Sequence, residues 1–252
     1  MDTTQQLNQM TDRQIRILKA IVDEYIASGS AVGSELLEKK FKVGYSPATI
    51  RNEMVVLGRM GFIEKSHFSS GRVPTPKAFR FYINTLLPKK PLSTADEVSM
   101  KNEVWDFKND EMRFLEETAR ILSEKSSLLS IVFLESGFRY YTGINHMLAI
   151  KEFLDYELSK MVFTYLDDID YWLKVLPDLV SNHDEISILL GDDYHVKQFQ
   201  NLGSVFSRFT INEKSGFIGL IGPCRLEYSS AVPLVNYSAQ IINEVFNKNA
   251  AE

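Results

Sequence analysis

The sequence has few of the residues on which redox, metal-binding and membrane proteins depend. Cys224 is its one cysteine, which excludes a disulfide within the chain, and its four histidines show no paired metal-ligand spacing. No run of apolar residues reaches the roughly 18 that a transmembrane helix needs, and the first residues do not have the pattern of a signal peptide. We therefore expect a cytoplasmic chain without a metal site, a membrane span or redox chemistry.

Catalytic motifs are also scarce. Residues 219–222 (Gly-Leu-Ile-Gly) precede a predicted helix, as phosphate-binding glycines do, but the third glycine of a dinucleotide motif and the lysine of a P-loop are missing. We interpret this segment as a structural turn, and we expect Arg225 to pair with an acidic side chain rather than hold a ligand. The adjacent carboxylates at 167–168 and 192–193 have no histidine or nucleophilic serine in a recognisable arrangement beside them. The sequence predicts that the chain is not an enzyme and needs no cofactor.

What the chain does have is an uneven distribution of charge. Its composition is ordinary for a globular protein of 252 residues, with 44% hydrophobic and 24% charged side chains, and its formal net charge is −5. Residues 11–87, however, contain 12 Lys and Arg against 7 Asp and Glu, whereas the rest of the chain contains 16 against 26. A basic module joined to an acidic body is typical of a DNA-binding domain attached to a regulatory domain, and a chance distribution of surface charge is the alternative.

The basic segment has the pattern of a small helical domain that ends in a β-hairpin. Apolar residues recur at helical spacing between capping residues and glycines, and after Gly61 the apolar period falls to two. Three helices followed by a hairpin are the arrangement of a winged helix-turn-helix. The predicted elements are helices at 11–28, 34–41, 46–60 and 77–87 and strands at 62–65 and 72–73.

The acidic remainder has the pattern of a mixed α/β domain. Its first amphipathic stretch predicts one helix or a helix pair, with Trp105, Phe114, Leu115 and Leu122 as the candidate buried positions. Residues 191–216 match no clear pattern. The predicted elements are helices at 97–123, 148–165, 169–180 and 229–246 and strands at 128–135, 138–142, 186–190 and 217–221.

These patterns divide the chain into three parts. A proline-containing segment after the fourth helix predicts a linker. We expect an α+β fold with a winged helix-turn-helix DNA-binding domain at 1–88, a linker at 89–96, and a regulatory and dimerising α/β domain at 97–252.

The third predicted helix carries the residues from which we infer DNA binding. At about 100° per residue, Ile50, Met54 and Leu57 share one face, which leaves the opposite face free to enter a groove of DNA. A recognition helix needs small residues near its N-terminus, side chains that form hydrogen bonds to base edges, and a cation for phosphate. The candidate DNA-binding residues here are Ser46, Ala48, Thr49, Arg51, Asn52 and Arg59.

The predicted hairpin adds a flexible polar wing suited to the DNA backbone or the minor groove. Its candidate DNA-binding residues are Lys65, His67, Ser69, Ser70 and Arg72. Two alternatives stay open. Three-helix bundles with exposed polar faces also dock proteins, and Arg51 could pair with Glu35 or with the neighbourhood of Glu53 instead of meeting DNA.

These residues stand in the order of a known family. The motifs of the basic part are Thr11-Asp-Arg-Gln, Ser46-Pro-Ala-Thr-Ile-Arg-Asn-Glu-Met54, Gly61-Phe-Ile-Glu-Lys65, Ser69-Ser-Gly-Arg-Val-Pro74 and Arg80-Phe-Tyr82. Beyond the linker follow Tyr141-Thr-Gly-Ile-Asn-His-Met-Leu148 and Gly219-Leu-Ile-Gly-Pro-Cys-Arg-Leu-Glu-Tyr228. Taken together, the chain closely resembles the HrcA family of heat-inducible transcription repressors along nearly its whole length, most strongly in residues 11–87.

The resemblance implies a homodimer that binds an inverted-repeat operator in double-stranded DNA, represses chaperone genes until heat stress, and is modulated by a chaperonin. It also implies a GAF-like second domain, which in typical members is interrupted by a dimerising insertion. This chain is shorter than those members between about Glu135 and Tyr140, so we expect a reduced GAF-like domain, and Leu226 replaces the usual methionine. The alternative function is a winged-helix regulator controlled by a small molecule in the second domain.

Overall fold

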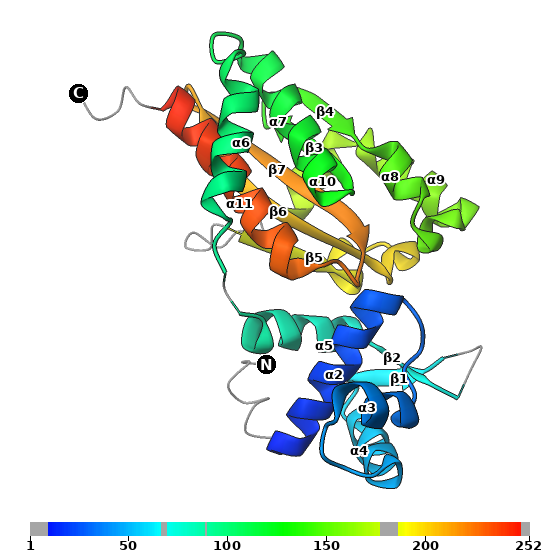
Figure 1. Ribbon diagram of the computed structural model, residues 1–252. Helices are drawn as coiled ribbons and strands as arrows, with labels where there is room; N and C mark the ends of the chain where they lie inside the picture. The colour runs from blue at the N-terminus through cyan, green and yellow to red at the C-terminus, as the bar shows by residue number, and fades with distance from the viewer. Residues whose placement is uncertain (1–9, 67–69, 89, 177–185, 248–252) are drawn as a thin grey trace. The chain divides into compact units, whose positions relative to one another are not determined.

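The computed structural model describes residues 10–66, 70–88, 90–176 and 186–247, and the chain divides into two compact units, Met1–Pro88 and Lys89–Glu252 (Figure 1). Each unit buries its own set of apolar side chains. Both contain helices and strands. The fold class is therefore α+β, as the sequence predicts.

The first unit consists of three helices, an antiparallel hairpin and a last helix. Its elements are α2 (Asp12–Ser28), α3 (Ser34–Phe41), α4 (Pro47–Arg59), β1 (Ile63–Lys65), β2 (Arg72–Pro74), α5 (Pro76–Phe81) and a π-helical turn (Tyr82–Leu86). The strands pair from Ile63 with Pro74 to Lys65 with Arg72. The order of these elements is the predicted one, and their boundaries agree with the prediction to within one residue.

Local capping explains where these helices begin and end. Thr11 Oγ1 accepts a hydrogen bond from the Gln14 N–H (3.3 Å), and the Gln14 side chain accepts one from the Thr11 N–H (3.0 Å), which forms a reciprocal capping box. Gly29 ends the same helix at a φ of 59°, a left-handed conformation that glycine adopts without steric cost. Ser46 caps α4 ahead of Pro47, whose missing N–H is no loss at the first helical position.

The second unit is built on a five-stranded antiparallel sheet with the strand order β4-β3-β7-β6-β5. Its strands are β3 (Leu129–Leu134), β4 (Arg139–Thr142), β5 (Ile186–Leu190), β6 (Leu202–Ile211) and β7 (Lys214–Pro223). Its α-helices are α6 (Thr94–Trp105), α7 (Glu111–Ser126), α8 (Ile144–Leu148), α9 (Tyr156–Leu166), α10 (Ile169–Val175) and α11 (Tyr228–Phe246).

Different helices cover the two faces of this sheet. On one face, α9 and α10 pack on the strands in a buried cluster, in which the rings of Trp172 and Phe206 lie 5.4 Å apart and Phe217 is also buried. On the other face lie α7 and α11, whose Phe114 and Phe246 rings are 5.1 Å apart. Large side chains therefore occupy the space on both sides of the sheet.

The first predicted helical stretch of this unit is a helix pair, α6 and α7. Phe114, Leu115 and Leu122 are buried as predicted. Trp105 is not: it is 39% exposed, because it is the last residue of α6 and its ring faces Lys108, whose Nζ lies 4.6 Å from the ring centroid.

The single helix predicted at 148–165 is wrong. The segment is divided into the end of α8, a 3-10 turn at Lys151–Leu154, and α9. The reason is a new N-cap, since the Asp155 side chain accepts a hydrogen bond from the Leu158 N–H (3.1 Å) and starts a separate helix.

Two predicted boundaries also move. Helix α10 ends at Val175, and residues 177–180 of the predicted helix lie outside the described residues. Helix α6 begins at Thr94, inside the predicted linker at 89–96, because the Ser93 side chain accepts a hydrogen bond from the Asp96 N–H (3.1 Å).

Arg225 forms the predicted ion pair. Its Nε and Nη2 donate to the two carboxylate oxygens of Glu152 at 2.6 and 2.9 Å, and the two side chains are 19% and 17% exposed. Asp168 and Asp193 accept hydrogen bonds from nearby backbone N–H groups, which is a structural use of these carboxylates.

The largest difference from prediction concerns β6 and β7. Strand β6 lies in the stretch that matches no pattern, because eight of its ten residues are buried and its two faces do not alternate in polarity. The predicted turn at 219–222 is wrong, since these residues lie inside β7. Gly219 pairs with Phe206, and a Cβ there would collide with the Phe206 ring and lie 2.5 Å from the Val205 carbonyl oxygen.

Gly219→Ala is expected to lower the free energy of unfolding by about 1–3 kcal/mol, because the added methyl group must displace a packed ring and a strand carbonyl. Urea denaturation followed by circular dichroism measures this change. Ser215→Ala on the same strand is the control: its hydroxyl meets only an exposed Arg208 contact at 3.0 Å, so the change should stay within about 0.5 kcal/mol. Wild-type stability of the alanine variant at 219 would contradict the close packing.

Candidate nucleic-acid interface

Helix α4 has one buried and one exposed face. Ile50 and Leu57 are fully buried and Met54 is 5% exposed, so these three side chains attach the helix to the core of the first unit. The residues that are exposed or half-exposed are Ser46, Ala48, Thr49, Arg51, Asn52, Val55 and Arg59. The apolar spacing in the sequence thus places the candidate residues on the solvent face.

The start of α4 is held by its own hydroxyl groups. Ser46 Oγ accepts a hydrogen bond from the Thr49 N–H at 3.2 Å and lies 3.0 Å from Thr49 Oγ1. The cap fixes the first turn, and therefore the direction in which Ala48 and the residues after it point.

Arg51 does not form the ion pair that the sequence left open. Glu53 is engaged by Arg13, whose Nε lies 2.9 Å from its Oε1, and by Gln14 Nε2 at 3.0 Å. Among the residues that the structure describes, Arg51 has no ion pair with Glu35 or Glu53. Its exposed guanidinium is therefore available for an external partner.

The hairpin residues are placed beside this helix. Lys65 and Ser70 are exposed, and Arg72 is half-buried with its Nη1 donating to the Ser70 carbonyl oxygen at 3.2 Å. The predicted residues His67 and Ser69 lie outside the described residues.

Two backbone hydrogen bonds join the hairpin to the segment before α3. The Val32 N–H donates to the Arg72 carbonyl (2.8 Å), and the Arg72 N–H donates to the Val32 carbonyl (3.0 Å). Gly71 makes this approach possible, because a Cβ there would lie 2.9 Å from the Ala31 Cβ. The side chain of Arg72 is thereby held close to the start of α3.

A groove of about 840 Å³ lies where α3, α4 and the hairpin meet. It is lined by residues 32–36, by Arg51 and Met54 of α4, and by Lys65, Ser70 and Arg72 of the hairpin. The structure thus brings together four of the predicted site residues, whereas Ala48, Asn52 and Arg59 lie on α4 outside the groove. Residues 32–36 are a part of the site that sequence reasoning missed, and their signal was a helix start at Gly33 without a capping side chain.

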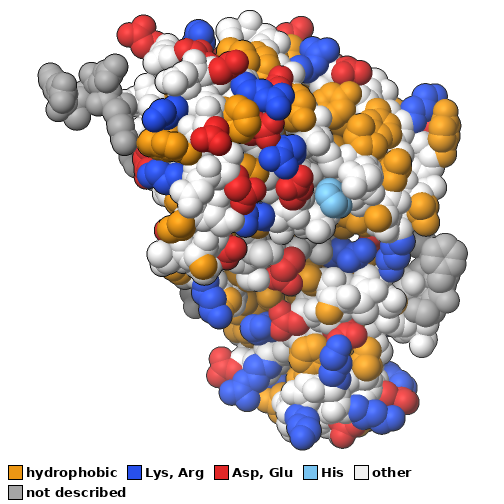
Figure 2. Space-filling view, turned by 45° about the horizontal axis from the view of Figure 1, so that its top comes forward, with side chains coloured by type: hydrophobic (Ala, Val, Ile, Leu, Met, Phe, Trp, Pro, Cys, Tyr) orange, Lys and Arg blue, Asp and Glu red, His pale blue; other side chains and the backbone are white. Residues whose placement is uncertain are grey.

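The charge of the first unit agrees with this geometry. Figure 2 shows Lys and Arg side chains spread over the lower part of the view, which belongs to this unit. A cationic surface raises the local concentration of polyanions and speeds their association.

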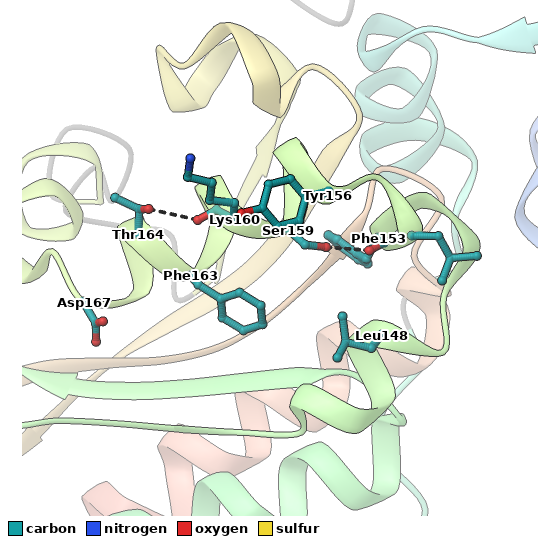
Figure 3. A pocket seen from close by; sticks show the side chains of 9 residues that line it. Leu148, Phe153, Tyr156, Ser159, Lys160, Phe163, Thr164 and Asp167 are labelled. Carbon is teal, nitrogen blue, oxygen red and sulfur yellow. Dashed lines mark hydrogen bonds between the residues drawn. The ribbon is translucent and has the colours of Figure 1, made fainter.

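The second unit carries an open apolar pocket of about 670 Å³ beside α8 and α9 (Figure 3). The Ser159 and Thr164 hydroxyls in it donate to the backbone carbonyls of Phe153 (2.5 Å) and Lys160 (2.9 Å), so neither is free for a ligand. Lys160 and Asp167 point away from the apolar side chains. The apolar lining residues are Leu148, Phe153, Leu154, Tyr156 and Phe163.

The helices give no sign of a membrane span. Across the described residues, none is both long enough and apolar enough to cross a bilayer.

The structure defines a class of protein: a basic helical unit that ends in a hairpin, followed by an α+β unit around an antiparallel sheet. A solved structure titled as a hypothetical protein at 2.2 Å resolution has this fold, with a TM-score of 0.72 and 17% identity over 95% of this chain and 98% of that one. The family profile of the HrcA protein C terminal domain matches residues 54–232. The chain belongs to the HrcA family.

Two relatives bear the name heat-inducible transcription repressor HrcA. The protein of Fusobacterium nucleatum is 25% identical over 329 residues, which cover 94% of this chain and 93% of the relative. The protein of Shouchella clausii is 42% identical over 123 residues, which cover 49% of this chain and 36% of the relative. Since the first alignment is longer than the 252 residues of this chain, the relative contains residues that have no counterpart here.

The cap of α4 can be separated from any contact that its serine makes with DNA. Ser46→Ala is expected to lower the free energy of unfolding by about 0.5–2 kcal/mol, because the Thr49 N–H loses its acceptor. Ser46→Asp keeps a capping oxygen and should retain wild-type stability, while its negative charge weakens binding to duplex DNA. Denaturant unfolding and fluorescence anisotropy measure the two effects. A Ser46→Asp variant that binds DNA as tightly as wild type would remove Ser46 from the interface.

Proposed function

We propose that this chain is a heat-inducible transcription repressor whose first unit is a winged helix-turn-helix that binds operator DNA. The observation that carries this proposal is the exposed, unpaired Arg51 on α4, next to a hairpin that backbone hydrogen bonds hold in place. The basic charge of residues 11–87 supports it, as do the family and the names of the two relatives.

In this function α4 is the recognition helix. Its 13 residues make a rod of about 20 Å, and the major groove, about 12 Å wide, admits such a helix. Arg51 and Asn52 are suited to paired hydrogen bonds with guanine and adenine edges, and the exposed Val55 to contact with a thymine methyl group. The remaining proposed DNA-binding residues are Ser46, Ala48, Thr49 and Arg59 of α4 and Lys65, His67, Ser69, Ser70 and Arg72 of the hairpin.

The second unit is proposed to be a reduced GAF-like domain that regulates and dimerises the repressor. An inverted-repeat operator has two half-sites, which a two-fold dimer matches with two recognition helices about 34 Å apart. At the position expected for the family's insertion, the chain makes a tight turn, with the Leu134 N–H bonded to the Phe138 carbonyl (2.9 Å) and the Gly137 N–H to the Leu134 carbonyl (3.0 Å). The dimer surface of this chain therefore lies elsewhere. A chaperonin is the proposed modulator, and the cytoplasm the proposed site of action.

The apolar pocket beside α8 and α9 is the one observation in favour of control by a small molecule. Small-molecule sites combine an apolar lining with a few convergent polar groups, and the hydroxyls of this pocket are already bonded to the backbone. The face of the sheet behind it is packed with aromatic side chains. We therefore place regulation by a protein partner ahead of regulation by a ligand.

A titration against two fluorescent duplexes tests the function. One duplex contains the family's inverted-repeat operator, the other has its half-sites scrambled, and both are measured at two salt concentrations. Tighter binding to the intact repeat by about a thousandfold or more is expected of a specific repressor. Equal, salt-sensitive binding to both duplexes, with or without added chaperonin, would contradict the proposal.

Arg51→Ala is expected to weaken operator binding by about 1–3 kcal/mol while binding to the scrambled duplex changes less, because a base contact is lost. Arg16→Ala is the matched control: Arg16 is an exposed arginine of the same unit, on α2, and lies outside the proposed interface. If Arg51→Ala bound the operator like wild type, α4 would be assigned the wrong reading face.

A further inference from the structure

The groove at the start of α3 contains hydrogen-bond donors that the described protein does not use. Gly33 precedes this helix and has no side chain to cap it, and the first intrahelical bond is donated by the Leu37 N–H to the Gly33 carbonyl (3.2 Å). The N–H groups of Ser34, Glu35 and Leu36 therefore have no acceptor within the described part of the chain.

Ser34 gives a second and independent sign of a missing partner. The residue is only 7% exposed, and it lines the groove. Its hydroxyl forms no hydrogen bond with any of the described residues. Buried hydroxyls are normally hydrogen-bonded, because an unpaired one costs free energy, so Ser34 is poised for an acceptor from outside the protein.

The charges around the groove select an anion. Arg51, Lys65 and Arg72 line it, and against these three cations stands one carboxylate, Glu35. Glu35 forms no ion pair among the described residues. The positive end of the α3 dipole adds to the cationic field at the same place.

The donors on the two sides of the groove are held in fixed register. The paired bonds between Val32 and Arg72 join the segment before α3 to β2. An anion that enters the groove therefore meets donors that are already in position, which lowers the entropic cost of binding it.

We propose that this groove binds one phosphate diester of the DNA backbone in each half-site. The Ser34 hydroxyl and the free N–H groups of α3 hold the phosphate from one side, and Lys65 and Arg72 from the other. This assignment rests on the proposed function, since it names the part of the operator that the groove contacts. The phosphate fixes the register of α4 on the duplex, so that Arg51 on the groove's rim faces one base step.

Operators that carry a single neutral methylphosphonate, placed at each backbone position of a half-site in turn, test the assignment. Wild type should lose about tenfold in affinity at the position that the groove contacts, because a charge-assisted bond is removed. Ser34→Ala should bind the unmodified operator and the scrambled duplex about three- to tenfold more weakly, with an unchanged ratio between them. At the sensitive position, the methylphosphonate should cost Ser34→Ala less than it costs wild type.

Two outcomes of this experiment are distinct. If the losses are additive at every position, Ser34 does not contact a phosphate and the proposal is overturned. If wild type does not prefer the operator to the scrambled duplex, the proposed function fails instead.

A gain of affinity provides a second measurement that misfolding cannot imitate. Glu35→Gln removes the one carboxylate of the groove and should tighten binding to operator and scrambled duplex alike by about two- to tenfold. Glu38→Gln is the control, because Glu38 is exposed on the same helix but does not line the groove. Equal effects of the two substitutions, or no gain with Glu35→Gln, would overturn the proposal.

Discussion

The proposed interface depends on the two hydrogen bonds between the backbones of Val32 and Arg72. They connect segments that are 40 positions apart in the sequence, and they do so through main-chain atoms that any pair of residues could supply. Without them a two-stranded hairpin is only marginally stable in water. With them, a short ribbon becomes part of the same rigid frame as α3, and α4 stands beside it.

The side chains around that contact explain why it can form. Gly71 lets the turn approach Ala31 so closely that a Cβ would not fit, and Arg72 closes the turn by donating to the Ser70 carbonyl. The same principle operates in the second unit, where Gly219 allows β6 and β7 to approach beneath the ring of Phe206. In both places a missing side chain on one segment makes room for contact with another.

The first unit could be predicted closely because its signals are local. The capping box at Thr11 and the Ser46-Pro47 start of α4 each lie within a few residues of the helix end that they determine. Strand β6 was not predictable in this way, since its burial on both faces arises from helices and strands that are distant in sequence. The solvent face of α4 follows from helical periodicity, whereas the groove does not, because it combines residues 32–36 with the hairpin, and only the folded chain brings these together.

The tight turn between β3 and β4 has a consequence for how this family varies. The register of these strands brings Phe133 opposite Arg139, so the chain leaves and re-enters the sheet at almost the same point. A segment of any length added there has neighbouring ends, and the entropy of closing such a loop grows only slowly with its length. The sheet therefore tolerates both the presence and the loss of a module at this point. Chains of this lineage can change their mode of assembly during evolution while the DNA-facing unit stays as it is.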